Sequence, residues 1–340
     1  MMQRTDHNVM STVDELSTRA ALLHADATVC DMVLPGSSAL DDRETTLPRF
    51  VAAGVNFVSL TVGTDRWTLE QTVLVVASER ARYLRHPEYV LVERVDDIDR
   101  AKREGKLALG LNFQGTNGLA GNLDMVALYH KLGVRSILLA YNQKNMVGDG
   151  CHERTDAGLS RFGVSLVKEM NRLGMLVDCS HTGARTSMDA MEVSTAPVIF
   201  SHSNAKSLFP HDRNVADELI KACAATRGVI GMNGMGIYIA ENDASTPALL
   251  RHIDYISDLV GPQHIGLGLD YVFYAENFYA RVRANPNRYP PDKYPIPQQF
   301  FQPEQLPELT ELLLRRGYSD EAVRGILGEN FLRVAKQVWK

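Results

Sequence analysis

The sequence predicts an α/β fold, a (β/α)8 barrel, from two observations. Short apolar runs recur along the chain, and segments with helical spacing separate them. Runs that are apolar on both faces are typical of parallel strands covered by crossover helices. Eight such strands close a barrel of this type. The eight runs are ATVCDMVL (27–34), VNFVSLTV (55–62), LALGLNF (107–113), RSILLAY (135–141), MLVDCS (175–180), APVIFS (196–201), GVIGMN (228–233) and HIGLGLD (264–270).

Helical patterns fill the intervals between the runs. They include TLEQTVLVVASERARYL (68–84), NLDMVALYHKLG (122–133), FGVSLVKEMNRLG (162–174) and VADELIKACAATRG (215–228). Several of them end in glycine, the usual stop signal at a helix C-terminus. A doubly wound open sheet is the alternative. That fold more often has a Gly-rich phosphate loop after its first strand, and ATVCDMVLPG (27–36) is no such loop.

The pattern divides the chain into an N-terminal helical extension (1–24) and a single barrel domain (25–340). Within the barrel, residues 271–305 are rich in Tyr, Phe, Pro and Asn and show no clear period. Long irregular segments in compact domains are usually lids or disordered, and the aromatic content favours a lid or a subunit contact. Residues 309–339 predict two closing helices, with Ser319 as an N-cap.

Composition and charge exclude several classes of protein. The net charge is −5, and no basic cluster with interleaved aromatic residues appears, so we expect no nucleic-acid partner. No run approaches the roughly 18 apolar residues of a membrane span, and the N-terminus lacks the apolar core of a signal peptide. Four cysteines in 340 residues do not form a disulfide framework. We therefore expect a cytoplasmic protein without a membrane partner.

Two Ser-His pairs follow neighbouring strands, in VDCSHTG (177–183) and VIFSHSN (198–204). In a barrel, groups at the C-terminal ends of strands meet at one rim. His181, His202, Asp31 in the first run and Asp270 at the end of the eighth would converge there. Imidazole and carboxylate suit zinc, with a metal-bound water as nucleophile and a carboxylate as base. The alternative for each histidine is a hydrogen-bonded structural residue.

Longer motifs carry a family resemblance. LVDCSHTG, PVIFSHSNAKSLFPHDRNVADELIKACAATRGVIGMN and HIGLGLD resemble the membrane (renal) dipeptidase family, peptidase family M19 of the amidohydrolase superfamily. The likeness extends from about residue 25 to the C-terminus. It implies a barrel of the metal-dependent hydrolase type that cleaves dipeptides with one or two zinc ions, and a homodimer.

The resemblance also implies roles for single residues. His181 and His202 match the two histidines of the family's second metal site, and Asp270 matches the catalytic acid–base residue. Arg213, in HDRN, matches the arginine that holds the substrate carboxylate, for which a two-pronged guanidinium is well suited. The alternative for Arg213 is a surface ion pair.

At three rim positions the chain departs from the family pattern. The His-x-Asp motif of the first strand reads Val29-Cys30-Asp31, so only Asp31 remains. Gln114 stands where the family has a metal-bridging Glu, and a neutral amide binds a cation more weakly than a carboxylate. Tyr141, followed by Asn142, replaces a histidine near the oxyanion. The pattern is that of a divergent bacterial branch.

These departures set the expected ligands. We expect one zinc ion per chain rather than two, or none if the site is degenerate. The candidate metal ligands are His181, His202, Gln114 and Asp31, and the candidate substrate-binding residues are Arg213, Tyr141 and Asn142.

A further cluster lies in NMVGDGCHERTDAGLS (145–160), which contains Cys151, His152, Glu153 and Asp156. Its spacing matches no standard zinc pattern, which favours a hydrogen-bonded loop over a set of ligands. Cys151 as a nucleophile is a weaker hypothesis, because no basic partner is evident.

Two functions stay open from the sequence. The first is a metal-dependent hydrolase acting on a dipeptide-like small molecule that carries a carboxylate. The second is a barrel that has lost metal hydrolysis and serves as a small-molecule binding protein or a metal-free enzyme.

Overall fold

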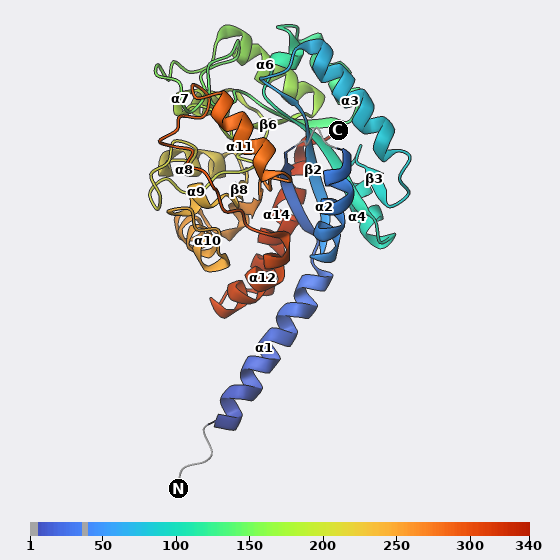
Figure 1. Ribbon diagram of the computed structural model, residues 1–340, viewed down its shortest axis with the longest axis vertical. Helices are drawn as coiled ribbons and strands as arrows, with labels where there is room; N and C mark the ends of the chain where they lie inside the picture. Colours follow the sequence, from blue (N-terminus) through green and yellow to red (C-terminus); the bar gives the residue numbers. More distant parts are fainter. Residues whose placement is uncertain (1–5, 36–39) are drawn as a thin grey trace.

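The computed structural model describes residues 6–35 and 40–340, and within these ranges parallel strands form a barrel with helices around it (Figure 1). The predicted fold class is therefore confirmed. The barrel strands are β1 (Val29–Leu34), β2 (Val55–Thr64), β4 (Leu107–Gln114), β5 (Val134–Leu138), β6 (Leu176–Asp178), β7 (Val198–Ile199), β8 (Ile230–Met232) and β9 (Ile265–Leu267). Each strand falls on one of the eight apolar runs.

The strands pair in the order β7-β6-β5-β4-β2-β1-β9-β8. A parallel bridge between Phe200 and Ile230 joins the two ends of this order. At this seam the Phe200 amide donates to the Val229 carbonyl over 3.1 Å, and the Gly231 amide donates to the Phe200 carbonyl over 2.7 Å. The sheet thus closes on itself, and the open-sheet alternative is wrong.

One short strand, β3 (Tyr89–Leu91), was not predicted from the sequence. It pairs in parallel with β4, outside the closed path of strands. Three residues give too short an apolar run to stand out in the sequence. The strand leaves the barrel of eight unchanged.

The helices lie between the strands and continue past the last one. They are α1 (Asp6–Asp26), α2 (Leu40–Ala52), α3 (Leu69–Tyr83), α4 (Asp96–Arg103), α5 (Asp124–Lys131), α6 (Arg161–Leu173), α7 (Ala184–Val193), α8 (Asp217–Ala225), α9 (Gly236–Ile239), α10 (Thr246–Val260), α11 (Ala275–Ala284), α12 (Leu306–Arg315), α13 (Asp320–Arg324) and α14 (Asn330–Val338). The four helices predicted at 68–84, 122–133, 162–174 and 215–228 are confirmed as α3, α5, α6 and α8.

Local sequence explains where several helices begin and end. Thr68 and Gln71 form a capping box at the start of α3. Ser160 caps α6, and Gly174 ends that helix with a φ of 82°, a left-handed conformation that favours glycine. The predicted cap at Ser319 is confirmed, because its side chain accepts a hydrogen bond from the Ala322 amide over 3.2 Å.

Helix α1 extends away from the barrel (Figure 1), and its C-terminal part packs against the core through Ala20 and Leu23. Buried His24 holds this part of the helix against the barrel through two hydrogen bonds. Its Nδ1 lies 2.7 Å from the Thr310 hydroxyl of α12, and its Nε2 lies 2.9 Å from the Ala53 carbonyl. The first five residues of the predicted 1–24 extension lie outside the described residues. Among the described helices, none has the length and hydropathy needed to span a bilayer.

Residues 271–305 form an ordered structure over the C-terminal ends of the strands. Contrary to the absence of a period in the sequence, they contain the ten-residue helix α11. A bridge between Met235 and Phe300 holds the segment to the loop after β8. Its buried side chains form a separate apolar cluster with those around α9: Met235, Ile237, Tyr238, Phe278, Tyr279, Val282, Tyr289 and Tyr294. The prolines and asparagines that follow α11 hide its short apolar stripe in the sequence.

Candidate active site

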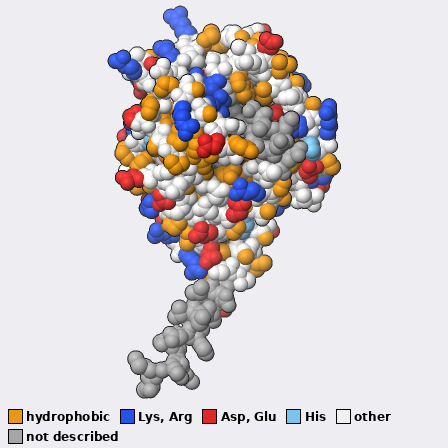
Figure 2. Space-filling model, viewed as in Figure 1, with side chains coloured by type: hydrophobic (Ala, Val, Ile, Leu, Met, Phe, Trp, Pro, Cys, Tyr) orange, Lys and Arg blue, Asp and Glu red, His pale blue; other side chains and the backbone are white. Residues whose placement is uncertain are grey.

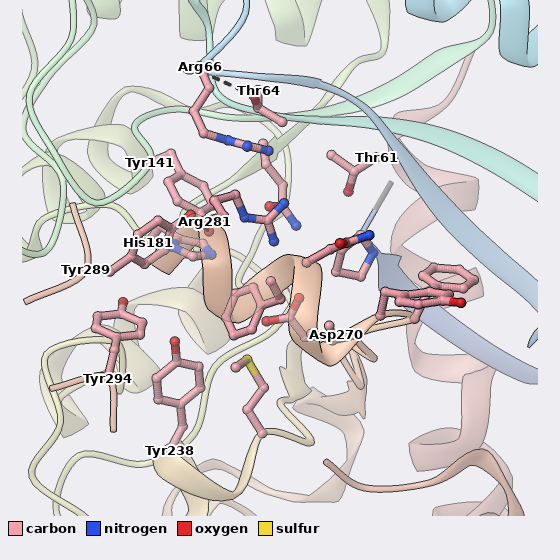
Figure 3. A pocket seen from close by; sticks show the side chains of 18 of the residues that line it. Thr61, Thr64, Arg66, Tyr141, His181, Tyr238, Asp270, Arg281, Tyr289 and Tyr294 are labelled. Carbon is pink, nitrogen blue, oxygen red and sulfur yellow. Dashed lines mark hydrogen bonds between the residues drawn. The ribbon is translucent and has the colours of Figure 1, made fainter. Parts of the chain in front are cut away.

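A cavity opens at the C-terminal ends of the barrel strands, beneath residues 271–305 (Figure 3). Its space, including the open mouth, is about 930 Å³. Four of the residues singled out in the sequence line it, one each from β4, the loops after β5 and β6, and the end of the β9 run. They are Gln114, Tyr141, His181 and Asp270.

The remaining four candidate residues lie behind the cavity wall. Asp31, Asn142, His202 and Arg213 each expose 2% or less of their surface. Arg213 lines a second hollow that shares His181 with the main cavity. The structure therefore places the eight candidate residues at the strand ends, where the sequence analysis expected them, and divides them between the cavity surface and the buried layer beneath it.

The two histidines lie against each other. Their ring centroids are 4.9 Å apart, with an angle of 60° between the planes. Burial lowers the pKa of both His181 and His202 well below the usual value, and the positive charge of Arg213 acts in the same direction. Both rings are therefore neutral at physiological pH, which is the form that binds metals.

Hydrogen bonds fix the tautomer of His202. The Ser201 hydroxyl donates its proton to Asp178, so it can only accept from His202 Nδ1, 2.7 Å away. The proton of His202 is therefore on Nδ1, and Nε2 carries a lone pair. This buried Nε2 has no hydrogen-bond partner among the described residues.

The same reasoning applies to His181. The Asn142 amide nitrogen donates to the Arg288 carbonyl and the Tyr294 hydroxyl, at 3.0 and 3.2 Å. The amide oxygen of Asn142 must then face His181 Nδ1, 2.6 Å away, and accept its proton. The lone pair of His181 is again on Nε2. In both histidines a hydrogen bond thus holds Nδ1 and leaves the lone pair on Nε2 free, as in metal-binding histidines.

The carboxylates occupy different surroundings. Oδ1 of Asp31 accepts hydrogen bonds from the amides of Val33 and Leu269, at 3.2 and 3.0 Å. Burial raises the pKa of Asp31 to about 7, and the charge of Asp270 adds to this effect. Oδ2 of Asp270 accepts from Asn233 over 3.1 Å. Burial also raises the pKa of Asp270, while Arg213 and Asn233 oppose the rise. A cavity carboxyl with a raised pKa is suited to proton transfer.

The donor set bears on metal binding. Two imidazole lone pairs, one of them buried and unpartnered, are sound ligands for a divalent ion. Yet within residues 6–35 and 40–340, no three His, Cys, Asp or Glu side chains come together as a metal cluster. His181 and His202 could hold one ion only with help from a weaker ligand, such as Gln114, or from water. No comparable set exists there for a second ion.

Three of the site residues have a left-handed backbone. The φ angles of Asn142, His181 and Asp270 are 62°, 61° and 54°. Residues other than glycine rarely adopt this left-handed backbone conformation, and those that do cluster at functional sites. At His181 the hydrogen bond from the Cys151 amide to its carbonyl, 2.7 Å long, holds the strained turn.

Asp65 organises the rim, although the sequence did not single it out. One oxygen accepts from the amides of Thr116 and Asn117, at 2.7 and 3.1 Å. The other accepts from the Tyr141 amide and the Asn145 side chain, both at 2.9 Å. Asp65 thus joins the ends of β2, β4 and β5. Its position directly after an apolar strand was the signal that could have revealed it.

Tyr141 covers His181 from the cavity side. Their rings stack with centroids 3.9 Å apart and an angle of 23°. The Tyr141 hydroxyl lies 3.3 Å from that of Tyr289, and burial raises the pKa of Tyr141. Two arginines that the sequence did not single out, Arg66 and Arg281, line the same side of the cavity.

The loop 145–160 is held by its own hydrogen bonds. Asp149 accepts from the Thr155 hydroxyl over 2.6 Å and from the Ala157 amide over 2.7 Å. Burial raises the pKa of Cys151 to about 12, so this residue is a thiol and no nucleophile. The hydrogen-bonded loop expected from the sequence is confirmed.

A barrel with neutral histidines and carboxyl groups gathered at the C-terminal ends of its strands defines the class of amidohydrolase-type barrels. Within that class the chain belongs to peptidase family M19, the membrane dipeptidases, whose family model matches residues 66–276 and 292–340.

Several known proteins are similar to the chain. Dipeptidase tcpJ of Claviceps purpurea is 32% identical over 254 residues, or 73% of this chain and 55% of that protein. Dipeptidase verJ of Clonostachys rogersoniana is 33% identical over 244 residues, or 69% of this chain and 56% of that protein. The chain thus spans about half the length of these curated relatives.

Solved structures show the same fold. An amidohydrolase from Pseudomonas aeruginosa has a TM-score of 0.85 at 29% identity, with 94% of this chain and 99% of that chain covered. A metallopeptidase from Rhodobacter sphaeroides, liganded with a phosphinate mimic of the dipeptide L-Ala-D-Ala, has a TM-score of 0.76 at 21% identity. That alignment covers 92% of this chain and 99% of the metallopeptidase.

Proposed function

We propose that the chain is a hydrolase that cleaves the amide bond of a dipeptide or a dipeptide-like small molecule. The observation that carries the proposal is the pair of neutral histidines, His181 and His202, each with a free Nε2, at the same rim as Asp270. Family M19 membership and relatives named as dipeptidases support it.

One divalent ion, zinc by the nature of the ligands, completes the proposed site. His181 and His202 would hold it through Nε2, with Gln114 and Asp31 as the nearest candidates for further ligands. Bound there, the ion would supply a water of lowered pKa as the nucleophile. Gln114 at the position of the family's bridging Glu, and the lack of a second ligand set among the described residues, support one ion rather than two.

The chain's own residues would do the remaining chemistry. Asp270 would accept a proton from the attacking water and pass it to the leaving amine, with Asn233 holding Oδ2 so that Oδ1 faces the reaction. Arg213 would hold a substrate carboxylate. Its Nη2 is used by the His202 carbonyl at 3.1 Å, whereas its buried Nε has no partner among the described residues.

Tyr141 and Asn142 would assist from the same loop. The Tyr141 ring lines the cavity and would contact the substrate beside His181. Asn142 is fully buried, and it would act by holding His181 in the tautomer that leaves Nε2 free. Residues 271–305 would act as a lid that keeps water out of the site.

Metal analysis and hydrolysis of a dipeptide panel test the proposal together. The full chain, purified after expression with added zinc, should contain about one zinc per chain. It should hydrolyse at least one dipeptide, lose that activity to a chelator and regain it with zinc. A protein without metal and without hydrolysis of any dipeptide would overturn the proposal. The second candidate is a metal-free barrel that binds a small molecule, and it is favoured by the absence of a three-residue cluster of ligands in the part of the chain that the structure describes.

A further inference from the structure

Two arginines that form no ion pair with a carboxylate of the described residues occupy one wall of the cavity. Arg66 follows β2 directly, and Arg281 lies on α11, so the two come from segments far apart in the chain. Figure 3 shows both side chains reaching into the same side of the cavity near Tyr141. Arg281 Nε is buried and has no hydrogen-bond partner among the described residues. The nearby Arg288 has a buried Nη1 that also has no hydrogen-bond partner among the described residues.

Several other arginines of the protein pair with acidic neighbours. Arg49 pairs with Glu304 at 2.7 Å, and Arg185 pairs with Asp189 at 2.8 Å. For Arg66 and Arg281, no carboxylate of the described residues lies within the 4.0 Å of an ion pair. Among the described residues, the wall therefore carries positive charge that no ion pair balances, and Asp270 is the acidic group of the cavity that interacts with Arg281.

Aromatic rings position these guanidinium groups instead of acids. Arg281 lies 5.1 Å from the ring centre of Phe278, and Arg66 lies 6.0 Å from that of Trp67. Cation–π contacts of this kind orient a guanidinium without neutralising its charge or using all its N–H groups. The N–H groups that remain are free for a ligand.

The arrangement is electrostatically unfavourable in the absence of a ligand. Burial lowers the pKa of Arg66, and the charges of Arg281 and Arg288 act in the same direction. Like charges gathered in a partly enclosed cleft repel one another and attract anions from solution. Over much of the face in Figure 2, basic and acidic side chains alternate, so the positive wall is a local property of the cavity.

The proposed function leaves this wall unused. Arg213 belongs to the second hollow, whereas Arg66 and Arg281 line the main cavity. The only other charged side chain among the described residues lining that cavity is Asp270. A dipeptide with one carboxylate, held by Arg213, would leave Asp270 as the single negative charge among the described lining residues, facing two arginines. A second acidic group on the substrate would balance the pair.

We propose that Arg66 and Arg281 form an anion subsite that selects substrates with an acidic side chain in addition to the carboxylate held by Arg213. The substrate class is then a dipeptide-like amide with two negative charges. This inference rests on the proposed function, because it assigns the substrate class of the same site. Planar guanidinium groups bind carboxylates through two parallel hydrogen bonds, which gives the subsite geometric selectivity as well as charge.

Matched pairs of dipeptides test the subsite. Ala–Glu and Ala–Gln, and Glu–Ala and Gln–Ala, differ only in the charge of one side chain. In at least one pair, the wild-type chain should have a kcat/KM about 10–100-fold higher for the acidic member, since a charged hydrogen bond is worth about 1.5–3 kcal/mol. Arg281→Met and Arg66→Met should each reduce this ratio by about tenfold or more, mainly by slowing the acidic substrate.

Arg283→Met is the matched control. Arg283 lies on the same helix, two residues from Arg281, but it is exposed and does not line the cavity. It removes the same net charge, so it should leave the ratio of the two substrates unchanged. An equal fall of the ratio in this variant would mean that the overall charge of the helix attracts anions, and the subsite would be refuted. A wild-type ratio near one in both pairs would refute it as well.

A binding measurement separates this inference from the proposed function. N-acetylglutamate and N-acetylglutamine can be titrated calorimetrically against the wild type, Arg281→Met and Arg283→Met, whether or not any dipeptide is cleaved. Tighter binding of the acidic probe, lost in Arg281→Met only, supports the subsite even if hydrolysis fails. Hydrolysis of dipeptides without any preference for the acidic probe or substrate would leave the proposed function intact and overturn the subsite.

Discussion

The two sides of the cavity differ in how their polar groups are satisfied. On the side built by strand ends, each site residue has one atom anchored by a hydrogen bond and another left free. His181 is anchored by Asn142, His202 by Ser201 and Asp270 by Asn233. On the side built by α11 and the end of β2, Arg66 and Arg281 lie against aromatic rings and have no acidic partner among the described residues.

This difference separates two kinds of preorganisation. The strand-end side is oriented before any ligand arrives, because rigid barrel strands and a layer of buried hydrogen bonds hold it. The arginine side is oriented by contacts with aromatic rings, and no ion pair with a described residue neutralises it. Substitutions on the first side should therefore affect dipeptides with acidic and with neutral side chains alike, or the stability of the protein. Substitutions on the second side should affect acidic substrates alone.

The largest effect is expected at Asp270. Asp270→Asn removes the carboxyl that would transfer protons, while the φ of 54° remains acceptable to asparagine. Turnover should fall about 10²–10⁴-fold for acidic and neutral dipeptides alike. Steady-state kinetics and elemental analysis of the same preparation measure it, and zinc content should stay at the wild-type level. Undiminished hydrolysis at normal zinc content would remove Asp270 from the mechanism.

A smaller effect is expected at Arg213, which tests whether the anchored side also binds the main-chain carboxylate. Arg213→Lys keeps the charge but loses the planar fork. For dipeptides, kcat/KM should fall about 10–100-fold, in line with the loss of one charged hydrogen bond. Dipeptide amides, which lack the carboxylate, are the control and should be nearly unaffected. Equal losses for both would show that Arg213 supports only the fold, through its contact with the His202 carbonyl.

The smallest effect concerns the buried hydrogen-bond layer itself. Ser201→Ala leaves His202 Nδ1 and the Asp178 carboxylate without the hydroxyl that joins them. The free energy of unfolding should fall by about 1–3 kcal/mol, because a buried polar group loses its partner. Urea unfolding measures this change. Ser207→Ala removes an exposed hydroxyl that bonds Asp217, and its change should stay within about 0.5 kcal/mol. Equal values for the two variants would contradict the anchoring described here.

The sequence predicted the barrel well because buried parallel strands are apolar on both faces, a pattern that few other structures share. It also located the strand-end side of the site. Once eight strands are assigned, the fold itself brings His181, His202, Asp31 and Asp270 to one rim. The closing strand β7 has only two residues, yet its run in the sequence was clear because the flanking residues are also buried.

The arginine side could not be predicted in the same way. Arg281 lies in a segment without a period, and its direction depends on how α11 packs over the mouth. Arg66 follows a strand, but nothing in the sequence separates it from an ordinary surface arginine. Arg213 was assigned through its motif, and only the three-dimensional structure shows that it belongs to a different hollow from these two. Which side chains face a cavity is a tertiary property, and no local pattern encodes it.

The left-handed backbone at Asn142, His181 and Asp270 has a consequence for the evolution of this site. Asparagine, aspartate, histidine and glycine are the residues that adopt such angles most readily. At these three positions the backbone thus restricts natural variation to a small set of residue types, and most of them have side chains that bind metals or carry protons. A descendant of this chain with a different reaction would be reached most easily by substitutions within that set. Libraries built to redirect the site should draw on the same four residues at these positions.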